Sequence, residues 1–208
     1  MRILNTFTFI FFILCADTVF ADFEKLTKSS YEKSGSNNAV VIYGANWGRQ
    51  WGCSKFDNAQ LLSLSFSRIN SVSRALDEQE LLLNSGLKLS AKNISQPYAI
   101  IVSPGEYALT GFDIKVSNSS KEVGHIRGTH ENLFENEKPV GGTFTVNAGE
   151  IVYIGDFGLD CLNEPIFWRF YIQKEDFKRY VDQFKKEYKF LADRSVIYRL
   201  FQTEKFGQ

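Results

Sequence analysis

Short apolar runs separated by turn residues extend from residue 39 to residue 172. Residues 39–43 are mainly β-branched, and residues 98–103 and 166–172 form two further apolar runs. Between residues 62 and 67, leucine or phenylalanine alternates with serine, a period of two that is typical of a half-buried strand. Many short strands with turns between them indicate a β-sandwich or barrel. We expect a mainly β fold, an antiparallel β-sandwich.

Turn chemistry predicts where these strands reverse. Proline followed by glycine at Pro104-Gly105 favours a type II turn, and Asn147-Ala148-Gly149-Glu150 lies between two further apolar runs. We expect each motif to close a β-hairpin, and Asn84-Ser85-Gly86 to be a third candidate turn. The apolar alternation changes phase at Gly111, which predicts a β-bulge.

The two ends of the domain have a different character. Residues 22–38 are polar, which predicts a flexible N-terminal segment that can contain a short helix. In residues 173–208, apolar positions recur with a helical period over 175–191, which predicts an amphipathic α-helix packed on the sandwich. Residues 196–201 suit either a last strand or a helical turn. Residues 117–142 are polar, and we expect an exposed, mobile loop there.

The first 21 residues have the composition of a cleavable secretory signal peptide. Arg2 precedes an almost wholly apolar stretch from Phe7 to Ala16, too short to cross a bilayer. Small or modest side chains precede Asp22, where we expect cleavage. Cys15 follows a bulky leucine, which disfavours lipid attachment. We therefore expect a periplasmic or otherwise exported protein with no transmembrane span after cleavage.

Charge narrows the range of partners. Basic and acidic residues balance at 24 each. A balanced chain has no electrostatic footprint for nucleic acid, so we expect no nucleic-acid partner. The aromatic content of 15% favours a β-rich core, because aromatic rings pack well on pleated surfaces.

Cys53 and Cys161 are the cysteines that remain after residue 21. An exported chain meets an oxidising compartment, so these two are expected to form one disulfide. The alternatives are two buried thiols or, less favoured, a catalytic cysteine, for which no histidine motif is present.

Two segments carry candidate ligand-binding residues. Trp47, Arg49 and Trp51 lie in a glycine-containing stretch before Cys53, and tryptophan and arginine dominate binding hot spots. The alternative is that the tryptophans close one end of the core. Three acidic residues surround the other cysteine, and a disulfide would bring them near the tryptophans: Asp156, Asp160 and Glu164. They would then form an acidic, aromatic-walled cleft for a sugar, a cationic peptide or Ca²⁺, or they are ordinary turn acids.

Metal and cofactor chemistry has weak support. His125 and His130 would hold Zn²⁺ with Glu131 or Glu135 only if the loop brought them together. The sequence contains no nucleophile elbow, phosphate loop, HExxH or dinucleotide fingerprint. We predict no cofactor and no resident metal.

The two turn motifs resemble those of exported bacterial β-sandwich proteins of unknown function. The matching segments are Pro104-Gly105-Glu106-Tyr107-Ala108-Leu109 and residues 144–155. Those proteins are built like the prealbumin-type modules appended to carboxypeptidases. The resemblance implies a sandwich in the bacterial envelope, and it transfers no catalytic residue.

The sequence therefore favours a non-enzymatic envelope module that binds an envelope protein or a cell-wall component. A hydrolase acting on envelope polymers through carboxylates such as Asp156 and Glu164 is one alternative. A small-ligand carrier that uses Trp47 and Trp51 is another.

Overall fold

The computed structural model describes residues 26–84, 96–162 and 165–206. The predicted signal peptide with Cys15, most of the candidate hairpin around Ser85, and Glu164 lie outside these ranges. Within the described ranges, none of the helices has the length and apolarity that a membrane span requires.

Five strands form the first sheet, called sheet A. Its strand order is β12-β11-β1-β5, and β13 also pairs with β11. The bounds are β1 Ala39–Ala45, β5 Gln96–Val102, β11 Ile151–Asp160, β12 Ile166–Phe170 and β13 Ile197–Tyr198. Pairs β1–β5 and β11–β12 are antiparallel, as expected, but β1–β11 and β11–β13 are parallel, so sheet A is mixed. The undecided segment 196–201 thus contributes a strand.

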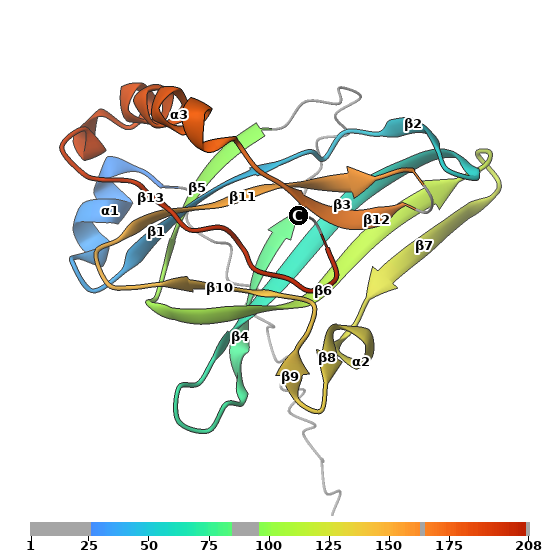
Figure 1. Ribbon diagram of the computed structural model, residues 1–208, viewed down its shortest axis with the longest axis horizontal. Coiled ribbons are helices and arrows are strands. Elements are labelled where there is room, and N and C mark those ends of the chain that lie inside the picture. Colours follow the sequence, from blue (N-terminus) through green and yellow to red (C-terminus); the bar gives the residue numbers. More distant parts are fainter. Residues whose placement is uncertain (1–25, 85–95, 163–164, 207–208) are drawn as a thin grey trace, which may run out of the picture.

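Six strands form the second sheet, called sheet B, and all their pairings are antiparallel. Its order is β10-β6-β3-β2, with β4 paired to β3 and β7 paired to β6. The bounds are β2 Gln50–Cys53, β3 Phe56–Ile69, β4 Leu76–Asn84, β6 Gly105–Ser117, β7 Val123–Gly128 and β10 Thr143–Val146. The two sheets make the chain mainly β, as the strand pattern predicts (Figure 1).

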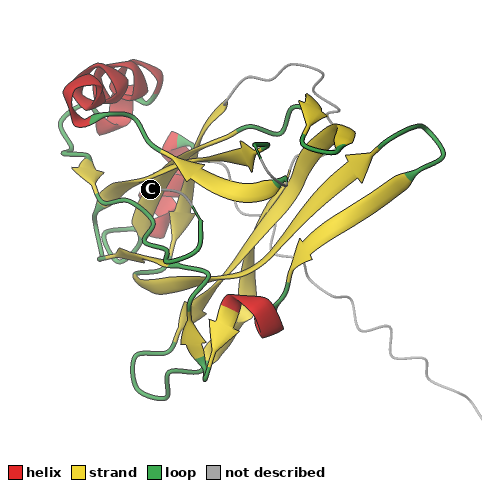
Figure 2. Cartoon of the chain, turned by 45° about the vertical axis from the view of Figure 1, so that its right-hand side comes forward, coloured by secondary structure: helices red, strands yellow, loops and turns green. Residues whose placement is uncertain are grey.

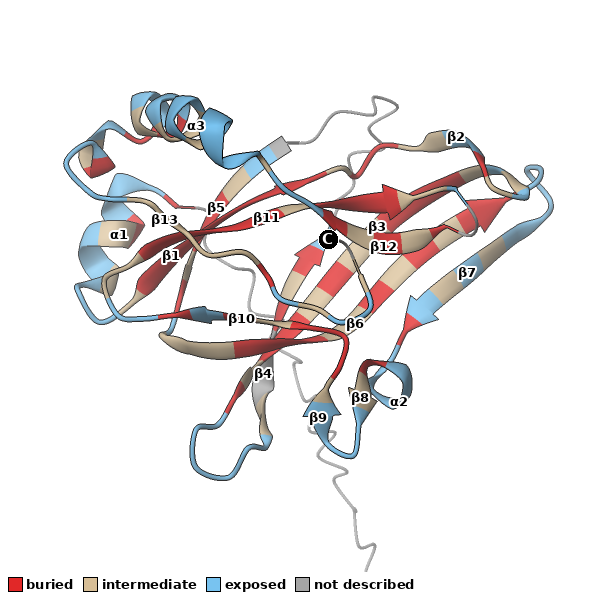
Figure 3. Ribbon diagram, in the orientation of Figure 1, coloured by how far each residue is buried: buried red, intermediate tan, exposed pale blue. Residues whose placement is uncertain are grey.

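The main core lies between the sheets and is rich in aromatic rings. Phe66 of β3 makes edge-on contacts with Phe144 and Phe201 and a tilted contact with Phe157. Buried positions alternate with less buried ones over parts of β3 and β6, and each strand also has a run of three buried residues (Figure 3). Leu64 and Phe66 are buried as expected, but Leu62 is only partly buried because the register shifts between Leu61 and Ser63.

Helices cover the outer face of sheet A. A second cluster joins Ile42 and Tyr153 of the sheet to Phe184, Tyr188 and Leu191. The helical elements on this side are α1 Lys28–Ser34, α3 Lys174–Glu187 and a 3-10 turn, Lys189–Leu191. Helix α3 confirms the predicted amphipathic helix. The molecule therefore has three layers, helices, sheet A and sheet B, and the short α2 (His130–Leu133) lies apart from α1 and α3 (Figure 2).

Both predicted hairpins are wrong in the same way. Glu150 N–H donates to the Asn147 carbonyl at 3.1 Å, so the second turn exists, whereas the chain only bends at Pro104 and the Gly105 φ of 152° is not that of a type II turn. However, β5 pairs with β1 while β6 pairs with β3, and β10 pairs with β6 while β11 pairs with β1. Each turn therefore carries the chain from one sheet to the other. The predicted bulge is confirmed, because the register of β3 and β6 skips Thr110.

The segment 117–142 is more ordered than the sequence suggests. It contains β7, α2 and a small hairpin of β8 (Phe134–Glu135) and β9 (Lys138–Pro139). Leu133 is completely buried, and Val140 is nearly so. These apolar side chains anchor a segment whose polar composition predicts an exposed loop. Within residues 22–38, the described part forms α1, capped by Thr27.

Candidate functional site

The two tryptophans of the candidate binding stretch are separated. Trp47 is buried, and its indole N–H donates to the Tyr98 hydroxyl at 2.9 Å. Trp51 is 69% exposed, and the Arg49 guanidinium lies 5.4 Å from its ring centre. Trp47 is thus a core residue, and a carrier that used this stretch would present one tryptophan rather than two.

The predicted disulfide is confirmed. Cys53 of β2 and Cys161, which directly follows β11, are bonded with their Cα atoms 4.6 Å apart. The bond therefore joins sheet B to sheet A. It brings Asp160 close to the Trp51 stretch, where the Asp160 carboxylate accepts the Leu162 N–H at 2.9 Å. Asp160 acts here as a turn acid.

Asp156 lies away from Asp160. Four residues of extended strand separate their Cα atoms by about 13 Å. Burial raises the pKa of the Asp156 carboxyl, and the Tyr153 hydroxyl and the Gly44 backbone partly oppose this shift. Within the described part of the chain, its Oδ1 atom is buried without a hydrogen-bond partner. The described acids therefore do not form one cleft beside Trp51, and Glu164 lies outside the described residues.

The two histidines have different partners. His125 Nδ1 lies 2.7 Å from Asp113 Oδ1, whereas the His130 ring stacks on Phe134 with centroids 4.2 Å apart. In the ranges that the structure describes, no group of three His, Cys, Asp or Glu side chains is placed to hold a metal ion. The zinc hypothesis gains no geometric support.

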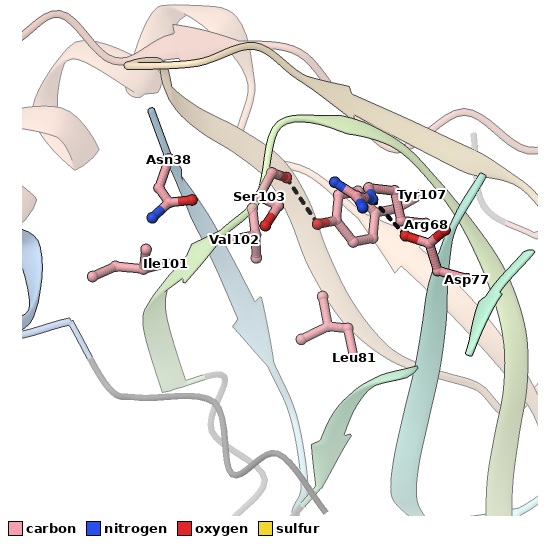
Figure 4. A pocket seen from close by; sticks show the side chains of 8 residues that line it. All are labelled: Asn38, Arg68, Asp77, Leu81, Ile101, Val102, Ser103 and Tyr107. Carbon is pink, nitrogen blue, oxygen red and sulfur yellow. Dashed lines mark hydrogen bonds and ion pairs between the residues drawn. The ribbon is translucent and has the colours of Figure 1, made fainter. Parts of the chain in front are cut away.

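A polar cleft of about 210 Å³ opens between the two sheets (Figure 4). It lies where β5 of sheet A and β4 of sheet B form neighbouring edges. Polar and aliphatic side chains line it together: Asn38, Arg68, Asp77, Leu81, Ile101, Val102, Ser103 and Tyr107.

Arg68 is the unusual residue of this cleft. It pairs in register with Tyr107, which pairs with Phe144, and the Tyr107 and Phe144 rings stack at 5.0 Å inside the sandwich. Because directly paired residues project from the same face of a sheet, Arg68 occupies an inward-facing position. Its Nε donates to the Asp77 carboxylate at 2.6 Å. The sequence holds a signal for this, since Arg68 interrupts the apolar period of Leu64 and Phe66.

Two further polar side chains of the cleft are hydrogen bonded. The Tyr107 hydroxyl donates to the Ser103 carbonyl at 2.8 Å, and the Asn38 amide donates to the Ser34 carbonyl at 3.0 Å. Burial raises the pKa of Tyr107 to about 12, with Arg68 opposing the shift. The hydroxyl therefore stays protonated at neutral pH, and the cleft offers fixed donors and acceptors.

A smaller pocket of about 170 Å³ lies between α3 and the start of β5. Strand β5 contributes Pro97 and Tyr98, and α3 with the residue after it contributes Tyr180, Gln183, Phe184, Glu187 and Tyr188. The Tyr180 hydroxyl is buried and has no hydrogen-bond partner among the described residues. The helical period predicts that Tyr180, Phe184 and Tyr188 share a face, but not that a pocket remains beneath them.

Comparisons of the chain with protein-family models, with curated proteins and with solved structures gave no significant match.

Proposed function

We propose that this protein is an exported, non-enzymatic binding module whose ligand enters the cleft between the sheets. The observation that carries the proposal is the Arg68–Asp77 ion pair, which lines the cleft with Arg68 at an inward-facing position of β3. The side chains of Arg68 and Asp77 are 40% and 27% exposed, so both charges remain within reach of a ligand in the cleft. An ion pair with this exposure contributes little to stability, which favours a functional reason for its place in the cleft.

The composition of the cleft supports recognition of a polar ligand. Arg68, Asn38 and Ser103 offer polar groups, while Leu81 and Val102 are apolar and suit the carbon skeleton of a ligand. A cell-wall fragment, which combines hydroxyl, amide and carboxylate groups with aliphatic carbon, fits this mixture. The proposed setting in the bacterial envelope rests on the signal-peptide pattern and on the resemblance of the turn motifs, and the disulfide fits an oxidising compartment.

The state of the polar groups favours binding over catalysis. A general acid or base works best with a pKa near the operating pH. Tyr107, with its pKa of about 12, is far from that condition, and Arg68 and Asp77 are bound to each other. The cleft is therefore suited to hold a ligand by fixed hydrogen bonds.

Titration with soluble peptidoglycan fragments tests the proposal. Isothermal titration calorimetry would compare the wild type with a double variant, Arg68→Met with Asp77→Leu, which removes both charges but keeps the side-chain volume. We expect the double variant to bind at least about tenfold more weakly, the usual result of losing charged hydrogen-bonding groups from a site. Arg74→Met is the matched control, because Arg74 forms a more exposed ion pair with Glu106.

Native mass spectrometry of protein recovered from the envelope of its host extends the test to fragments outside the panel. A retained adduct on the wild type and on Arg74→Met, but not on the double variant, supports the proposal. Equal binding by all three proteins, or no bound mass and no calorimetric signal, would contradict it.

A further inference from the structure

The pocket beneath α3 differs in chemistry from the cleft between the sheets. Three aromatic residues spaced four apart, Tyr180, Phe184 and Tyr188, line it from the α3 side, and the Phe184 and Tyr188 ring centres are 4.8 Å apart. The ring of Tyr98 is held toward the core by stacking on Tyr43 and by the Trp47 indole. Aromatic faces attract cations through their electron density. This pocket therefore has the walls of a site for an organic cation.

The charge that lines the pocket is negative. Glu187 lines the pocket, and among its described lining residues none is basic. Burial raises the pKa of the Tyr180 hydroxyl, and Asp156, Tyr188 and Glu187 raise it further. Two carboxyl groups thus act on the Tyr180 hydroxyl, from the sheet and from the helix. A positive charge in the pocket would be stabilised by Glu187, which lines it.

One buried hydroxyl of the pocket lacks a partner. The Tyr180 hydroxyl lines the pocket and is buried and unbonded among the described residues. A buried polar atom without a partner costs free energy, which a donor from a ligand would recover. A primary ammonium group supplies three N–H donors, whereas a quaternary ammonium group supplies none.

We propose that this pocket binds a primary organic ammonium group, as carried by a free alkylamine or by a lysine side chain. The volume of about 170 Å³ suits such a group with a short alkyl chain. The ammonium lies beside the Tyr180 hydroxyl and the Glu187 carboxylate, and the alkyl chain lies against Phe184 and Pro97. The site is independent of the cleft that contains Arg68.

Chemical-shift changes in NMR spectra of the protein test this assignment with simple probes. The wild type would be titrated with n-butylammonium and with n-butanol, its uncharged analogue, in a buffer free of amines. We expect n-butylammonium to bind at least about tenfold more tightly, with the largest shifts at the rings of Tyr180 and Tyr188. Binding of n-butanol with equal affinity, or no shift at these rings with either probe, overturns the proposal.

Three variants test which side chains contribute to the affinity for n-butylammonium. Glu187→Gln should lower the affinity for n-butylammonium about fivefold. Tyr180→Phe should lower this affinity by a similar factor, because the hydroxyl acceptor is lost. Asp182→Asn, at an exposed position of α3, is the control and should leave the affinity unchanged. Since Glu187 is exposed, its variant tests the proposal even if Tyr180→Phe disturbs the fold. Equal affinity in Glu187→Gln and the wild type, or an equal loss in the control, contradicts the proposal.

The source of the ammonium group is resolved by a second ligand. N-acetyl-lysine methylamide presents the same group on a peptide backbone. If it binds as tightly as n-butylammonium, the occupant is a lysine side chain of a polypeptide. If only n-butylammonium binds, the occupant is a free alkylamine, because the pocket excludes the attached backbone.

Discussion

At the scale of single residues, one ion pair fixes the turn between β10 and β11. The Glu150 carboxylate accepts from the Arg199 guanidinium at 2.7 and 3.2 Å and from the Asn147 N–H at 2.9 Å. These bonds, with the Arg199 contact first, lower the pKa of Glu150 from 4.5 to about 2, and partial burial opposes the shift. The pair ties this turn to the chain that follows β13.

The lowered pKa predicts how stability depends on pH. Because the folded-state pKa lies below the unfolded value, the stabilisation is complete above about pH 4.5 and is lost as the pH falls toward 2. Glu150→Gln should therefore reduce the free energy of unfolding by about 1 kcal/mol at pH 7, since water partly screens the pair, and by much less at pH 2. Urea unfolding at a series of pH values measures this difference.

An exposed glutamate supplies the control for this experiment. Glu122→Gln should follow the wild-type profile at every pH, because Glu122 is exposed and lies just before β7. A difference between the wild type and Glu150→Gln that stays constant from pH 7 to pH 2 would contradict the assignment to an ion pair.

The residue scale also shows what the sequence could reveal about the sites. The pairing of Cys53 with Cys161 was predictable from the sequence. An exported protein meets an oxidising compartment, and only two cysteines follow residue 21, so each has a single possible partner. The burial of Trp47 was not, since an indole suits both a core and a binding surface, and only the position of Tyr98 decides. The sequence shows Arg68 as a break in the apolar alternation. It does not show the ion pair with Asp77, because that pair forms only when β4 lies beside β3.

At the scale of elements, the positions of the turns were easier to predict than the strand pairing on either side of them. Local chemistry bends the chain at Gly105 and at Gly149, and both residues have positive φ. A turn does not determine which strand its arms pair with, because strands that leave a corner of a sandwich can enter the opposite sheet. The apolar alternation is the same in both cases, so the hairpins and the sheet crossings were indistinguishable from sequence.

Helix α3 and the 3-10 turn after it were predictable from their period, and their packing gives a second test. Leu191 is fully buried in the cluster between sheet A and the helices. Leu191→Ala should lower the free energy of unfolding by about 2–4 kcal/mol, because it leaves a cavity against the sheet. Urea unfolding followed by circular dichroism measures the loss.

The matched control for Leu191 is Lys186→Ala on the exposed side of α3. This substitution should change the free energy of unfolding by less than about 0.5 kcal/mol. If both variants unfolded at the same urea concentration, the cluster between α3 and sheet A would contribute little to stability, contrary to the structure.

At the scale of the whole molecule, the two sheets are connected at opposite ends. The turns at Gly105 and Gly149 lie together, because Val146 pairs with Gly105, and both lead between the sheets. The Cys53–Cys161 disulfide joins β2 to the far end of β11. The core between the sheets is therefore closed by backbone turns at one end and by a covalent bond at the other.

This arrangement makes the disulfide a large contributor to stability. The bonded cysteines are 108 residues apart, and the chain-entropy model assigns about 4–5 kcal/mol to a loop of this length. Reduction should lower the urea midpoint of unfolding strongly. It should also make the free energy of unfolding depend more steeply on urea concentration, because the reduced unfolded chain exposes more surface. The double variant Cys53→Ala with Cys161→Ala should match the reduced wild type and should not respond to reductant. An unchanged wild-type midpoint under reducing conditions would mean that the turns and the aromatic core alone hold the sheets together.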